Sequence, residues 1–216
     1  VFVLYLLLSI LIAGAWLIFN KKKSLKESIK FIFNPKVFFS KSATSDYKVF
    51  FINQIIMLLI SPHLLTQITI ATALYFFFFE INFIEMGLFA SSPKYLIVSL
   101  FTLTHFIVDD FSKYIVHRWM HNWPFLWALH KVHHSATNLT PMTVFRTHPL
   151  EGLVFTLRSA FAQGVTISTF VYLFGGGVDL YTILGANLFV FFFNVFGSNL
   201  RHSHICLLYA SPSPRD

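Results

Sequence analysis

Long stretches without a charged residue are the feature that most restricts how this chain can fold. The first of them, VFVLYLLLSILIAGAWLIF at residues 1–19, is close to the ~20 residues that a helix needs to cross a bilayer. Charged residues make up 12% of the 216 residues, whereas soluble domains have about a quarter. We therefore predict an all-α, polytopic integral membrane protein that forms one membrane domain over residues 1–216. Its further predicted spans are 49–79, 95–108, 153–174 and 178–197.

The distribution of charge between these runs predicts their orientation. A cluster of lysines in NKKKSLK follows the first span, and the positive-inside rule places that end in the cytoplasm. The connection 80–93 has two glutamates and no lysine or arginine, as expected of an external loop. The histidine-rich segments at 117–134 and 202–204 then fall on the cytoplasmic side. We therefore expect a histidine-rich helical cap on the cytoplasmic face.

Two stretches in the first half of the chain fit this pattern less simply. Residues 30–48 mix apolar residues with lysine around Pro35, so we expect them to lie along the lipid headgroups. The run 49–79 is too long for one straight span and is interrupted by SPH at 61–63. We interpret it as one kinked crossing, with a helical hairpin as the alternative.

Five histidines lie in the segment HRWMHNWPFLWALHKVHH. The first two are four residues apart and so share a helical face, and the last three form a second group beyond a break at Pro124. Neutral imidazoles crowded in this way need either separate partners or a shared cation, so we predict that they ligate metal. These residues are His117, His121, His130, His133 and His134. The isolated His63 and His105 are expected to be ordinary hydrogen-bonded residues.

The residues between the ligands restrict the metal chemistry. A zinc protease of the H-E-x-x-H kind needs a glutamate as general base, and HRWMH has none. Bis-histidine haem would use single histidines on separate membrane helices. Imidazole suits iron, and this many histidines could hold two iron ions, a pair that can activate O₂ to attack an unactivated C–H bond.

Three segments, DFSKYIVHRWMH, LWALHKVHHS and PMTVFRTHPLE, together closely resemble the fatty acid hydroxylase / sterol desaturase superfamily of membrane non-haem di-iron oxygenases. That family has an H-x3-H box, an H-x2-H-H box and a further histidine segment after a membrane hairpin. The resemblance covers roughly residues 95–205. It implies that the five histidines above are catalytic metal ligands, and that His202 and His204 in RHSH are further ligands.

The resemblance also implies residues that support the ligands. Asp110, Tyr114 and Arg118 stand where the family has its D…Y…HR pattern. A carboxylate at 110 could orient a ligating imidazole, and capping of a helix end is the alternative. His148 in RTHP is also a family position, and we expect it and Arg146 to support the site rather than to ligate.

Four other side chains are predicted to lie at the membrane surface. Trp119, Trp123 and Trp127 recur at helical spacing beside the histidines, as interfacial anchors do. Arg158 lies near the cytoplasmic start of the hairpin formed by the last two spans, where its long side chain can snorkel to water.

The end of the chain departs from the family pattern. The family continues from its histidine segment to a final H-x2-H-H box, whereas this sequence reads CLLYASPSPRD after RHSHI. The composition of residues 206–216 differs from that of the preceding chain, as in a non-native tail. We therefore expect an incomplete ligand set, with which this fragment would bind metal poorly or be inactive.

The favoured function is O₂-dependent hydroxylation or desaturation of a membrane lipid, either a fatty acyl chain, a sterol or a related compound, by two non-haem iron ions. Electrons would come from a separate donor protein, because the chain has no flavin or nicotinamide fingerprint. The net charge of +7 is spread between apolar runs, which argues against a nucleic-acid partner. The alternative is a non-enzymatic membrane protein that binds or transports a metal, although a transporter should place ligands within its spans.

Overall fold

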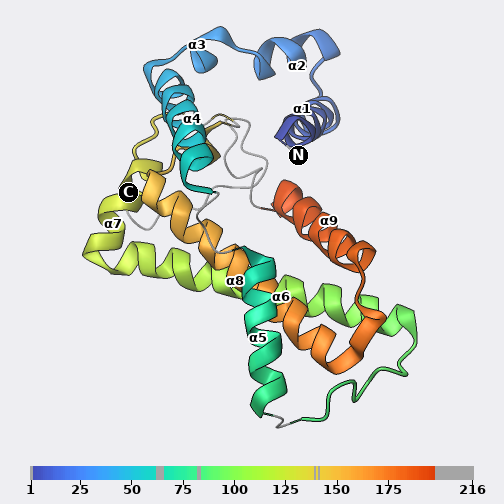
Figure 1. Ribbon diagram of the computed structural model, residues 1–216. Coiled ribbons are helices and arrows are strands. Elements are labelled where there is room, and N and C mark those ends of the chain that lie inside the picture. Colours follow the sequence, from blue (N-terminus) through green and yellow to red (C-terminus); the bar gives the residue numbers. More distant parts are fainter. Residues whose placement is uncertain (1, 62–65, 82–83, 139, 141, 198–216) are drawn as a thin grey trace. The chain divides into compact units, whose positions relative to one another are not determined.

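A computed structural model describes residues 2–61, 66–81, 84–138, 140 and 142–197, and every regular element within them is a helix (Figure 1). This confirms the predicted all-α class. The chain divides into two compact units, which are described separately. The first comprises residues 1–55, 130–148 and 192–216, and the second comprises 56–129 and 149–191. The helices are α1 (Phe2–Phe19), α2 (Leu25–Ile32), α3 (Pro35–Phe38), α4 (Lys41–Ile60), α5 (Gln67–Ile81), α6 (Lys94–Asn122), α7 (Pro124–His134), η2 (Thr143–Phe145), α8 (Pro149–Phe174), η3 (Gly175–Gly177) and α9 (Leu180–Gly197).

In the first unit, α1 packs against the short helix α2. Ala13 and Leu17 of α1 form a small buried cluster with Ile32 of α2. The start of α2 is fixed by a capping box, in which the Ser24 hydroxyl accepts from the backbone N–H of Glu27 and the Glu27 carboxylate accepts from the backbone N–H of Ser24. The chain therefore turns sharply after its first apolar helix.

The predicted surface stretch 30–48 is divided between three helices. It begins at the end of α2, continues through the single turn of α3, which has Pro35 at its start, and enters α4 at Lys41. The last eight of these residues thus belong to a 20-residue helix. The sequence pattern did not predict that residues 41–48 belong to this helix, because the side chains at the start of α4 are polar.

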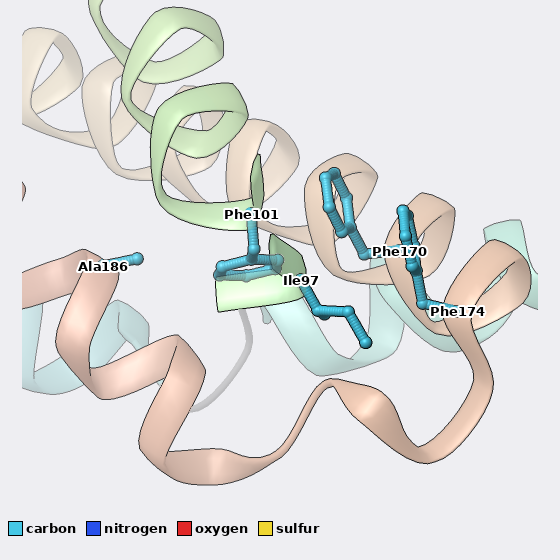
Figure 2. Close-up of a cluster of buried hydrophobic side chains, with 5 residues drawn as sticks. All are labelled: Ile97, Phe101, Phe170, Phe174 and Ala186. Atoms are coloured by element: carbon cyan, nitrogen blue, oxygen red, sulfur yellow. The ribbon is translucent and has the colours of Figure 1, made fainter. Parts of the chain in front are cut away.

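In the second unit, α8 packs against both α5 and α6. The core lies where α6, α8 and α9 meet (Figure 2). The rings of Phe170 and Phe174 stack with centroids 5.1 Å apart, and Phe101 meets Phe170 edge-on at 5.3 Å. Ile97 and Ala186 complete the cluster. The last two predicted spans are confirmed as helices, joined at the GGG turn by η3.

Two other predicted spans have different ends from those expected. The run 49–79 contains the end of α4 and most of α5, and residues 62–65, with His63, lie outside the described residues. The choice between a kinked crossing and a hairpin therefore stays a prediction. The run 95–108 is only the first half of α6, which has 29 residues and continues to the first histidine pair.

Among the described residues, α4 and α6 are long and apolar enough to cross a membrane. Length and composition alone are weak support for membrane insertion, since buried core helices share them. The cytoplasmic orientation of the histidine segments stays a prediction.

The connection between α8 and α9 is held by polar contacts. Lys94 Nζ lies 3.0 Å from the Asp179 carboxylate and donates to the Gly177 carbonyl at 2.7 Å. The same carboxylate accepts from the backbone N–H and the hydroxyl of Thr182. The carboxylate lies directly before α9, at the end of the helix that favours negative charge.

α8 packs so closely on α5 at Gly164 that one added methyl group is expected to destabilise the protein. A Cβ atom at Gly164 would lie 2.8 Å from Ile70 Cγ2 and 3.1 Å from the Gln67 carbonyl oxygen. We expect Gly164→Ala to lower the free energy of unfolding by about 1–3 kcal/mol. Gly185→Ala in α9 is the matched control, because no neighbouring atom of the described residues lies within 4 Å of its added Cβ. Denaturation in detergent measures both variants, and equal stability of the two would contradict the packing described.

Candidate metal centre

The first histidine pair is carried by α6. His117 and His121 are one turn apart near the end of this helix, and their Nε2 atoms are 3.2 Å apart. The two rings meet edge-on with centroids 4.7 Å apart. The side chain of His117 is exposed and that of His121 is half-buried. The predicted spacing of one helical turn is thus realised with both ring nitrogens converging.

The second histidine group is carried by α7, which begins at Pro124 as predicted. The Nε2 atoms of His130 and His134 are also 3.2 Å apart, and the rings of His130 and His133 stack with centroids 5.6 Å apart. The side chain of His130 is only 2% exposed. This group therefore repeats the geometry of the first pair and adds a third imidazole.

A separation of 3.2 Å between two imidazole nitrogens permits two arrangements. One ring can donate an N–H hydrogen bond to the other, or both can bind one cation. Two metal–nitrogen bonds of about 2.1 Å at a right angle place their nitrogens roughly 3 Å apart. Each pair therefore fits two adjacent coordination positions of one metal ion. The first pair belongs to the second compact unit and the other three histidines belong to the first unit.

Two adjacent acidic residues of α6, two turns before the first histidine pair, differ in their burial. Asp110 is exposed, whereas Asp109 is buried and forms an ion pair with Arg158 of α8 at 2.8 Å. Arg158 also donates to the Asp109 carbonyl and to the Ser112 hydroxyl, each at 2.8 Å. The expected snorkelling of Arg158 is therefore wrong, since its guanidinium is held between two helices. The role of Asp110 in orienting a ligand stays a prediction.

Two further family positions lie on the exposed side of α6. Arg118 Nη1 donates to the Tyr114 hydroxyl at 3.3 Å, across one helical turn. Trp119 and Trp123 are exposed and stack with centroids 5.6 Å apart, while the ring of Trp127 lies 5.5 Å from that of His121. This exposure is compatible with the predicted interfacial anchoring of the tryptophans.

Arg146 supports the second histidine group through the end of α7. Its Nε atom donates to the Val132 carbonyl at 3.2 Å, and its Nη1 atom donates to the Asp46 carboxylate at 2.9 Å. His148 is half-buried directly before α8, and the preceding Thr147 carbonyl accepts from the Asn53 side chain at 2.8 Å. The geometry agrees with a supporting role for Arg146. Sequence reasoning missed Asp46, whose only signal was a charge in an otherwise polar stretch.

Three further histidines lie outside the two groups on α6 and α7. His105 is buried in α6, where its ring stacks against that of Phe101 with centroids 6.1 Å apart, as expected for an ordinary core histidine. His202 and His204 lie outside the described residues, as does the whole segment after α9. Their predicted ligation of metal therefore stays a prediction.

A model of the fatty acid hydroxylase family matches residues 102–213, which is more than half of the chain. The chain therefore belongs to this family, and the resemblance inferred from the histidine boxes is confirmed. The matched segment contains both described histidine groups and the RHSH sequence. The family is known for membrane-bound, iron-dependent oxygenases.

Two relatives carry names that indicate lipid oxidation. The chain is 36% identical over 73 residues to the Δ(7)-sterol 5(6)-desaturase of Eremothecium gossypii, covering 33% of this chain and 20% of the relative. It is 29% identical over 133 residues to a candidate methylsterol monooxygenase of Dictyostelium discoideum, covering 58% of this chain and 45% of the relative. The chain thus spans less than half of either relative. No solved structure matches it.

The Asp109–Arg158 pair generates a prediction about stability. Both side chains are only about a tenth exposed, at 11% and 12%, so Asp109→Asn leaves a poorly compensated guanidinium between α6 and α8. We expect a loss of about 3 kcal/mol in the free energy of unfolding, most of which Asp109→Leu combined with Arg158→Met restores. Lys94→Met breaks the exposed ion pair instead and should cost less than about 1 kcal/mol. Equal losses in Asp109→Asn and Lys94→Met, measured by denaturation in detergent, would contradict this account.

Proposed function

We propose that the chain is the histidine-bearing part of an O₂-dependent lipid hydroxylase or desaturase. The observation that carries this proposal is the convergence of Nε2 atoms to 3.2 Å in each of two histidine pairs, both inside the segment that matches the family. Family membership supplies the reaction class, oxidation of a lipid. The two pairs supply donor atoms of the kind that a non-haem metal requires.

Two iron ions are the metal that we propose for this site. Neutral imidazole nitrogens suit iron, and both histidine groups consist of such donors. When bound, the irons would supply activation of O₂ for oxidation of a C–H bond. The ligands would be His117 and His121 on α6, then His130, His133 and His134 on α7, with His202 and His204 as further candidates.

The described residues around the ligands would keep the imidazoles in place. The ion pair of Asp109 with Arg158 fixes α6 against α8 two turns before the first histidine pair. The hydrogen bond from Arg146 to Val132 fixes the last turn of α7. Ligands held in this way lose less freedom when they bind a metal, which strengthens binding.

A membrane lipid is the proposed substrate, and the names of both relatives favour a sterol. The second unit contains an apolar cavity of about 170 Å³ between α5 and α8, lined by residues that include Thr169 and Tyr172. The contacts of Asp109 with Arg158 and of Phe101 with Phe170 show that α6 and α8 run antiparallel. Thr169 therefore lies roughly 22–28 Å along the helices from His117. We do not assign this cavity to the reacting carbon, which must lie beside the histidines.

Oxidation of a lipid by O₂ also requires a source of electrons that can reach the irons. We propose that a separate protein delivers electrons to the irons, and that the histidine groups face the cytoplasm, on the same side of the membrane as the lysine-rich segment after the first span. This is the side on which an aqueous donor protein would meet the site.

The test is O₂-dependent turnover by purified full-length protein in nanodiscs that contain sterols or fatty acyl lipids, with microsomal electron donors. We expect His121→Ala and His134→Ala each to lower product formation, followed by mass spectrometry, at least ~100-fold, because each removes one nitrogen of a converging pair. Lys94→Met, at the α8–α9 connection, is the control and should retain activity. Metal binding without O₂ consumption on any of these lipids would contradict the proposal and favour a non-enzymatic metal-binding protein.

A further inference from the structure

Asp46 on α4 is a fully buried carboxylate, with an exposed fraction of 0%. Both of its oxygens accept hydrogen bonds, one from Arg146 Nη1 at 2.9 Å and the other from the Thr143 hydroxyl at 2.8 Å. A charge withdrawn from water is tolerated only when it is paired and hydrogen-bonded. These donors meet that requirement, and both come from the segment that follows α7 along the chain.

Arg146 extends this contact to the helix that carries the second histidine group. Its Nε atom donates to the carbonyl of Val132, which lies between His130 and His133. Val132 is in the last turn of α7, where carbonyl groups favour a positive charge nearby. Its carbonyl also accepts from the backbone N–H and the hydroxyl of Ser135, at 3.3 and 2.7 Å. A single guanidinium therefore joins the buried carboxylate of α4 to the backbone between the histidines.

Other contacts from the same face of α4 reach the same segment. The Ser42 hydroxyl accepts from the backbone N–H of Thr137 at 3.2 Å. The Phe50 ring meets the Phe145 ring edge-on at 5.4 Å, and the Asn53 side chain donates to a backbone carbonyl two residues further on, at 2.8 Å. The α4 residues at these contacts recur every three or four positions, which places them on one helical face. They are Ser42, Asp46, Phe50 and Asn53.

We propose that this face of α4 holds the second histidine group in position, and that Asp46 is the central positioning residue of this face. Asp46 would act in two ways. It holds Arg146, and through it the end of α7, in the position that metal ligation requires. It also neutralises a guanidinium that would otherwise oppose the binding of a cation by the neighbouring histidines. The metal part of this inference rests on the function proposed above.

The inference extends the metal site beyond the segment that defines the family. The family match begins at residue 102, whereas Asp46 and the other three residues of this face precede that position by 49 to 60 residues. A fragment limited to the matched segment would therefore lack the α4 face that holds its second histidine group in position.

The first experiment titrates metal-depleted protein with Co²⁺, whose absorption reports the geometry of its ligands. We expect Asp46→Asn to weaken Co²⁺ binding ~10–100-fold and to change the spectrum, the range seen when residues that orient metal ligands are removed. Asp46→Asn combined with Arg146→Met should recover part of the affinity, because it also removes the uncompensated charge. Asp179→Asn, which removes a carboxylate from an exposed ion pair, is the matched control and should bind as the wild type does.

The second experiment measures hydrogen exchange of the metal-free protein and does not depend on metal binding. We expect Asp46→Asn to increase exchange in residues 130–147 and to leave α8 unchanged. If Asp46→Asn does not fold, Ser42→Ala and Asn53→Ala, which each remove one hydrogen bond of the same face, take its place.

The two experiments separate the failure of this inference from the failure of the proposed function. Wild-type exchange in residues 130–147 of a folded variant overturns the positioning role of this face. Unchanged Co²⁺ affinity and spectrum in Asp46→Asn overturn its role at the metal. A wild-type protein that binds no metal contradicts the proposed function, and the exchange result then decides the positioning role alone.

Discussion

A guanidinium paired with a carboxylate away from water is the interaction on which both histidine groups depend. Asp46 with Arg146 fixes the end of α7, and Asp109 with Arg158 fixes α6. The four side chains are between 0% and 13% exposed, so either member left alone would carry a large desolvation cost. Each pair therefore strongly favours one arrangement of the helices that it joins. That arrangement decides where the histidine rings on these helices lie. The convergence within each histidine pair follows from the helical repeat, whereas the ion pairs fix where the two helices lie.

Local patterns in the sequence were enough to predict the all-α class and the two histidine groups, although not the start of α4 or the full length of α6. The spacing of His117 and His121 needs only the helical repeat, and Pro124 marks the break between α6 and α7. Asp109 and Asp110 show where this reasoning stops. Adjacent residues point about 100° apart on a helix, so which carboxylate is buried depends on where α8 packs, and that is not a local property. Asp46 was missed for the same reason, since its partner lies a hundred positions further along the chain.

The division between apolar and polar parts of the chain suits a reaction on a lipid. In α6, apolar turns that contribute Ile97 and Phe101 to the core lead to a histidine pair at the other end. A lipid lying along such a helix could bring one carbon to the metal without leaving an apolar environment. The chain spans 20% and 45% of the two relatives, so selection of the lipid and of its carbon is proposed for the whole protein.

The central claim is that the histidine groups hold two iron ions, and Mössbauer spectroscopy of the full-length protein loaded with ⁵⁷Fe tests it most directly. The account predicts two irons per chain in a nitrogen-rich, high-spin environment, with magnetic coupling between them in the oxidised state. It also predicts that His121→Ala and His134→Ala each abolish that coupling. A single uncoupled iron per chain, or a coupled pair that survives both substitutions, would contradict it.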